Sequence, residues 1–147
     1  MATKTFKLER VLVYRREMEK LRSQELIAAK EDLELANQEL QREEEKVKEL
    51  TQEFCCCQNE IACIDEIRMY SDFFARKRGE IKIKKEQIEE LDQVMSDCRI
   101  DLLEASRDKK VLESLKEKKK LEFQREMAHK ERNFLDEISI QKKSEPL

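Results

Sequence analysis

The stretch from Leu26 to Ile64, LIAAKEDLELANQELQREEEKVKELTQEFCCCQNEIACI, carries the pattern that decides the fold. Apolar residues recur in it at alternating spacings of three and four, and Glu43 is the one polar residue that the pattern selects. The selected positions are Leu26, Ala29, Leu33, Ala36, Leu40, Glu43, Val47, Leu50, Phe54, Cys57, Ile61 and Ile64. Such a heptad repeat predicts a helix that packs along one narrow stripe, or seam, against a second helix.

A second seam of the same spacing follows later in the chain, and Lys84 and Lys109 are its two polar members. Its positions are Ile81, Lys84, Ile88, Leu91, Met95, Cys98, Leu102, Ala105, Lys109 and Leu112. We expect the two seams to pack on each other after the chain folds back, with Ile64 opposite Ile81 and Phe54 opposite Leu91. A shift by one heptad would preserve both seams and change only the loop.

The predicted fold is therefore all-α, a single long antiparallel two-helix coiled-coil hairpin with a stalk-like shape that spans residues 1–147. We place the first helix at about 5–69, the tip at about 66–80 and the second helix at about 73–141. Gly79, the only glycine, falls in the predicted tip. Glu43 and Lys109 are expected to cost stability in the seam and to help fix the register.

Composition agrees with long helices and excludes several other classes. Charged residues make up 44% of the chain, and a single Gly and a single Pro cannot supply the turns of a sandwich, a barrel or an α/β fold. A net charge of −3 and few aromatic residues argue against nucleic acid as a partner. No stretch has the length and hydrophobicity of a signal peptide or a membrane span. We expect a cytoplasmic protein.

No pattern indicates an enzyme, a cofactor or a metal site. The chain has no glycine-rich phosphate loop, and its single histidine, His129, lies in a charged stretch. Consecutive residues on a helix point in different directions, so Cys55, Cys56 and Cys57 do not form a zinc site. Cys57 and Cys98 fall on seam positions, and the remaining cysteines, Cys55, Cys56 and Cys63, are expected to be exposed.

Two groups of residues are candidates for partner binding. At the predicted tip, Tyr70, Phe73 and Phe74 either close the end of the coiled coil or form an aromatic binding site. The apolar residues near the two termini extend beyond one seam, and they either pack on each other or meet a partner. The terminal candidates, with neighbouring basic residues, are Phe6, Leu8, Arg10, Val11, Leu12, Tyr14, Arg15, Arg16, Leu135 and Ile138.

Three segments give the chain a resemblance to the FliJ family of flagellar type III export proteins. Phe6–Glu17 resembles the family's apolar and basic start, and Tyr70–Phe73 resembles its Tyr-x-x-Phe at the tip of the hairpin. Lys109–Lys118 and Glu131–Ile138 together resemble its charged second helix and the closure of that helix. Their order and spacing match the family over nearly the whole chain.

The resemblance implies a non-enzymatic stalk in the central pore of a hexameric export ATPase, where it promotes assembly of the ring. It further implies contact with the cytoplasmic domain of the export gate, binding of export chaperones, and a peripheral position at the inner membrane through these partners. Phe73 matches the gate-contacting Phe of the family, Tyr70 matches the accompanying Tyr, and the termini would contact the ring. The alternatives are a coiled-coil scaffold or holdase chaperone without an ATPase partner, and the equivalent injectisome stalk protein.

Overall fold

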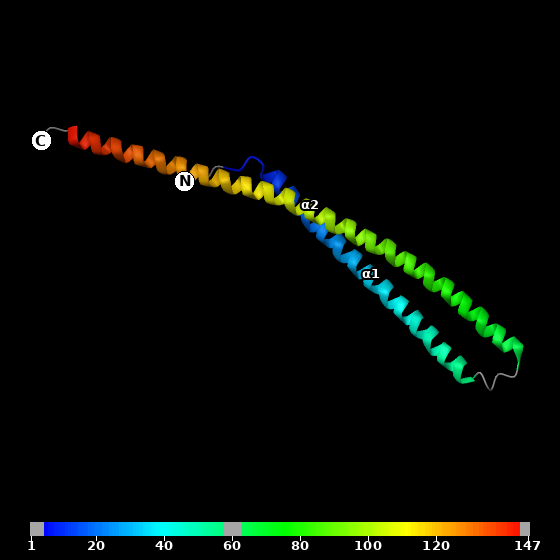
Figure 1. Cartoon of the computed structure of the whole chain (residues 1–147). Coiled ribbons are helices and arrows are strands. Elements are labelled where there is room, and N and C mark those ends of the chain that lie inside the picture. The colour runs from blue at the N-terminus through cyan, green and yellow to red at the C-terminus, as the bar shows by residue number, and fades with distance from the viewer. Residues whose placement is uncertain (1–4, 58–62, 145–147) are drawn as a thin grey trace. The chain divides into compact units, whose positions relative to one another are not determined.

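A computed structural model describes residues 5–57 and 63–144. They form two helices, α1 (Glu9–Cys57) and α2 (Ile64–Ser144), and no strand occurs in this part of the chain. Parts of α1 and α2 lie side by side (Figure 1). The prediction of an all-α fold in which two long helices pack on each other is confirmed.

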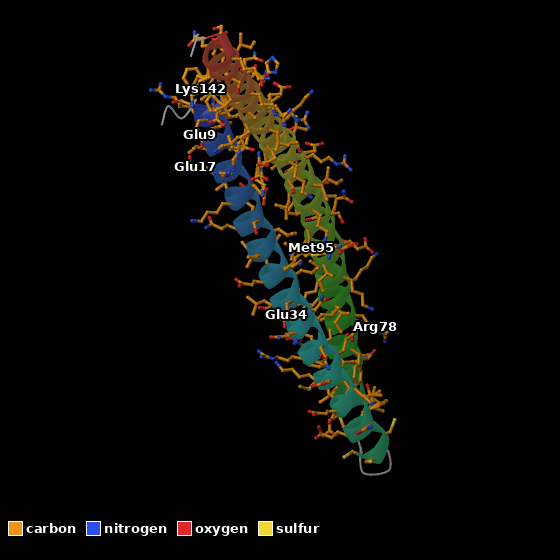
Figure 2. The ribbon with its side chains drawn as sticks, turned by 90° about the vertical axis from the view of Figure 1, so that its left-hand side faces the viewer. Glu9, Glu17, Glu34, Arg78, Met95 and Lys142 are labelled. Carbon is orange, nitrogen blue, oxygen red and sulfur yellow. The ribbon has the colours of Figure 1, made fainter. Side chains whose placement is uncertain are left out.

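The two predicted seams are the least exposed lines of residues along the helices. From residue 30 to residue 57 of α1, the seam positions alone are shielded from solvent. All the predicted positions of the second seam, from Ile81 to Leu112, are likewise half-buried. Charged residues such as Glu34 and Arg78 project from the rest of the helix surfaces (Figure 2). Ile64 is exposed, and Ile61 lies outside the described residues.

The chain divides into two compact units. The central unit consists of Leu21–Leu102, and the terminal unit combines Met1–Lys20 with Leu103–Leu147. In each unit the α1 part runs antiparallel to the α2 part. Shielding is shallow throughout, and Leu12 and Ala29 are the only described residues that are buried. This follows from two-helix packing, in which each helix has only one neighbour to cover it.

The predicted helix ends and turn are wrong. We expected the first helix to continue to about residue 69 and the chain to turn within 66–80, but α1 ends at Cys57 and residues 66–80 lie inside α2. Gly79 occupies an ordinary helical position without positive φ, and no atom lies within 4 Å of the place where a Cβ would be. A glycine costs a helix only about 1 kcal/mol relative to Ala, so the long apolar seam overrides it.

The predicted register, that is, which residues of the two helices face each other, is also wrong. Phe54 packs on Tyr70 and Phe74, with ring centroids 5.0 and 6.1 Å apart, and therefore does not face Leu91. The error amounts to about three heptads, a displacement that leaves every seam residue on the seam. The second seam continues toward the N-terminus of α2 through Lys77, Phe74 and Tyr70 at the same spacing of three and four. The polar Lys77 concealed this continuation.

No helix in the described ranges is both long and apolar enough to cross a membrane.

Candidate partner-binding sites

An aromatic cluster joins the end of α1 to the beginning of α2 in the central unit. Its members are Phe54, Tyr70 and Phe74, and the Phe54 ring meets Phe74 edge to face. Each of them is a half-buried seam residue. Tyr70 and Phe74 therefore pack within the helix pair, which is the structural alternative considered for the predicted tip. No described contact tests whether they also bind a partner.

Phe73 differs from these neighbours because it lies off the seam. Its half-buried ring meets Phe74 edge to face at 6.2 Å and, unlike Tyr70 and Phe74, makes no ring contact with Phe54 in the described part of the chain. Two cations lie over it instead, with the Arg76 guanidinium carbon 5.3 Å and the Lys77 Nζ 5.7 Å from the ring centroid. The family resemblance named Phe73 as the gate-contacting residue, and this assignment stays a prediction.

A charged cluster interrupts the apolar seam beside Phe73. Lys77 Nζ donates a hydrogen bond to Glu43 Oε2 over 2.9 Å and lies 3.2 Å from Glu80 Oε2. Lys84 and Lys46 approach the other carboxylate oxygen of Glu43 to 3.9 and 3.7 Å. The hydrogen bond from Lys77 lowers the pKa of the Glu43 carboxyl, and the bonds to Glu43 and then Glu80 raise the pKa of Lys77.

Sequence reasoning identified Glu43 as a polar seam residue but missed its partner. Lys77 was read as part of an exposed basic run with Arg76 and Arg78. The missed signal is its spacing: Lys77 stands three residues after Phe74 and four before Ile81, which places it on the seam. An acidic seam residue on one helix and basic seam residues on the other could have been matched as opposite charges.

In the terminal unit, the beginning of α1 packs on α2 through Leu12. The Leu12 side chain is fully buried, while the neighbouring Leu8, Val11 and Tyr14 remain 39, 41 and 54% exposed. Of the other predicted residues near this terminus, Phe6 is half-buried and Arg10 is exposed. One apolar residue of this region, Leu12, is therefore buried, and the others remain accessible to a partner.

Four ion pairs hold the terminal unit together and occupy two of the predicted basic residues. Arg15 lies 3.1 Å from Asp108, and Arg16 lies 3.5 Å from Glu113. Lys109 on the seam forms an ion pair with Glu19 at 2.8 Å, and this carboxylate raises the pKa of the lysine. The fourth pair joins Lys116 to Glu9 at 2.8 Å. Arg15 and Arg16 therefore hold α1 against α2.

The last part of α2 extends beyond the beginning of α1 (Figure 1). The Lys116–Glu9 pair marks where α1 begins, and Leu135 lies about 28 Å further along the helix axis at 1.5 Å per residue. From residue 124 to residue 144, every residue except Ile138 is exposed. Phe134 is 63% exposed and Leu135 is 61% exposed.

The two groups of predicted terminal residues are therefore not brought together by a described contact. We considered that Leu135 and Ile138 pack on the apolar residues at the start of α1, but that segment packs around Lys116 instead. The uncovered segment also includes Met127 and Phe134, 41 and 63% exposed, which were not among the predicted partner-binding residues. The sequence pattern that could have identified them is the apolar face of α2, which continues beyond the seam through Phe123, Met127, Phe134 and Ile138.

The cysteines lie as predicted. Cys55, Cys56 and Cys63 are exposed, and Cys57 and Cys98 are half-buried on their seams. Across the described residues, no group of three or more His, Cys, Asp or Glu side chains is arranged to hold a metal ion.

Comparison with known proteins identifies the family of the chain. The family model described as flagellar FliJ protein matches residues 7–145, and its match includes every predicted partner-binding residue except Phe6. Searches of the curated proteins and of the solved structures found no match. Because the family model covers almost the whole chain, the chain belongs to the FliJ family of flagellar export-associated proteins.

Proposed function

We propose that this chain is a non-enzymatic component of the flagellar type III export apparatus that binds the hexameric export ATPase as a central stalk. In this role it promotes assembly and activity of the ring. It also links the ring to the cytoplasmic domain of the export gate and to export chaperones. It works in the cytoplasm and reaches the inner membrane only through these partners. Family membership supports the export role, and the surfaces of the chain support the contacts.

The observation that carries the proposal is the uncovered apolar face at the end of α2. Met127, Phe134 and Leu135 are 41, 63 and 61% exposed on a helical segment that the described part of α1 does not cover. Phe134 and Leu135 point about 100° apart, so these residues form a broad exposed apolar surface, which is typical of a helix that binds another protein. We assign this face, with the accessible residues at the beginning of α1, to the ATPase ring.

The experiment adds the purified chain to the purified export ATPase and measures ring formation and ATP hydrolysis. We expect both to rise, and the Phe134→Ser and Leu135→Ser variants to weaken the effect. Ile140→Ser is the matched control, because Ile140 is 66% exposed but lies about 120° around the helix from Phe134. If the wild-type chain changes neither quantity, or if Ile140→Ser is as harmful as Phe134→Ser, the ring assignment fails.

A second contact, with the export gate, is proposed for the surface around Phe73. Phe73 lies off the seam with a half-buried ring beside the aromatic cluster, and Arg76 next to it has a side chain 66% exposed. An aromatic ring next to an accessible guanidinium is a frequent anchor in protein interfaces. Isothermal titration of the gate's cytoplasmic domain should detect binding to the wild-type chain and much weaker binding to Phe73→Ala. Equal binding of both would remove Phe73 from the interface.

A further inference from the structure

Lys77 connects the packing of the two helices to the surface of Phe73. Its Nζ lies 2.9 Å from Glu43 of α1 and at the same time 5.7 Å from the centroid of the Phe73 ring. Lys77 and Phe74 thus both contact α1 and Phe73, Phe74 through its ring contacts with Phe54 and Phe73 and Lys77 through its charge. Any change in the position of this ammonium group changes the environment of the ring.

Glu43 is what holds Lys77 in this position. The Lys77 and Glu43 side chains are only 17 and 16% exposed, so their charges depend on each other more than on water. Without Glu43, Lys77 loses its ion pair with α1 and keeps only Glu80, 3.2 Å away on its own helix, as a carboxylate partner. Lys84 carries a second positive charge near the Glu43 carboxylate, at 3.9 Å. Without the carboxylate, the positive charges of Lys77 and Lys84, both on α2, would repel each other along the seam.

We propose that Glu43 is a positioning residue for the partner surface around Phe73. By binding the Lys77 ammonium on the seam, Glu43 fixes one cation against the inner side of the ring and leaves Arg76 as its accessible cation. The surface then presents one aromatic ring and one guanidinium, which suits a partner site with an apolar pocket and a neighbouring carboxylate. This inference rests on the proposed function in treating Phe73 as a contact with the gate.

The first test measures the ring itself and needs no partner. Fluorinated phenylalanine is incorporated at position 73 and its ¹⁹F resonance is recorded in the full chain. We expect Glu43→Gln to shift this resonance, because Lys77 loses its anchor. Glu44→Gln is the matched control: Glu44 makes an ion pair with Lys85 at 3.6 Å, and both side chains are about half exposed. Identical spectra for Glu43→Gln and wild type would overturn the proposal.

A second variant separates positioning from packing. Joint replacement Glu43→Leu and Lys77→Leu restores an apolar seam, and replacing a shielded ion pair with apolar residues often preserves or raises stability. We expect this double variant to unfold at a urea concentration no lower than wild type and still to show a displaced Phe73 resonance. If its resonance matches wild type, the ion pair serves packing alone and the proposal is wrong.

The third test measures binding of the gate's cytoplasmic domain. We expect roughly tenfold weaker affinity for Glu43→Gln and for the double leucine variant, and unchanged affinity for Glu44→Gln. Full affinity of the folded double leucine variant would contradict the positioning role. If the wild-type chain does not bind the domain at all, the proposed gate contact fails, whereas the ¹⁹F comparison still decides whether Glu43 positions Phe73.

Discussion

The contact between Phe54 and the start of α2 gives the sharpest quantitative prediction. Phe54 meets Tyr70 at 5.0 Å and Phe74 at 6.1 Å, in tilted and edge-to-face geometries. Replacing a buried Phe with Ala costs about 3–5 kcal/mol of unfolding free energy. Phe54 is half-buried, so we expect Phe54→Ala to cost about 2 kcal/mol, of which the two ring contacts contribute about half.

Double-mutant cycles followed by urea unfolding and far-ultraviolet circular dichroism measure this contact. The structure predicts a coupling free energy of about 0.5–1.5 kcal/mol between Phe54→Ala and Phe74→Leu. The matched cycle combines Phe54→Ala with Leu91→Ala, because Leu91 would face Phe54 in the register that the seams alone suggested. That second coupling should be indistinguishable from zero, within about 0.5 kcal/mol.

The reverse result would refute the observed register. Clear coupling of Phe54 to Leu91, with none to Phe74, would mean that α1 and α2 pair about three heptads away from the arrangement described above. Unfolding midpoints that depend on protein concentration would show that association between chains contributes to stability, and the cycles would then be measured at one fixed concentration.

Three further predictions concern single positions. Leu12→Ala should lower the unfolding free energy by about 3 kcal/mol in urea titrations, because Leu12 is fully buried, whereas Leu8→Ala should cost less than about 1 kcal/mol; equal losses would contradict the packing of the terminal unit. Gly79→Ala should raise the thermal midpoint, with a gain of about 0.5–1 kcal/mol, because the site is helical and open; a loss would indicate a turn there. The lowered pKa of Glu43 means that its contribution to stability is present above the unfolded pKa of this carboxyl and is lost as the pH falls through the folded pKa. Acid titration should therefore destabilise wild type and Glu44→Gln more steeply than Glu43→Gln, and parallel curves would contradict this assignment.

The fold was predictable because its signal is local and repeated. Each heptad of the first seam independently predicts the same helical face, and the structure shields those positions and few others. The roles of Cys57 and Cys98 followed from the same periodicity. The face of a residue within a helix depends only on its neighbours in sequence, so one chain is sufficient to predict it.

Register and turn position depend on which residues meet across the helices, and the heptad leaves that choice open. The predicted turn at 66–80 followed from pairing the two seams with Ile64 opposite Ile81, and Gly79 only happened to fall within it. The same error changed the predicted surroundings of the aromatic residues at the tip. Tyr70 and Phe74 were expected at a turn, but the seam brings them against Phe54, a contact that only the correct register reveals.

The charged seam residues indicate the register of the two helices, which the apolar seam residues leave open. With Phe54 opposite Leu91, the same antiparallel pairing would place Glu43 beside Leu102 and Lys109 beside Ala36. In the structure Glu43 instead contacts Lys77 and Lys84.

In the predicted register each of these partly shielded charges would lose hydration without gaining a partner of opposite charge, which is unfavourable. Lys109 likewise pairs with Glu19, and this second match selects the same displacement independently of the first. In a two-helix coiled coil, the apolar seam therefore determines which faces meet, and the few polar seam residues determine where along the helices they meet.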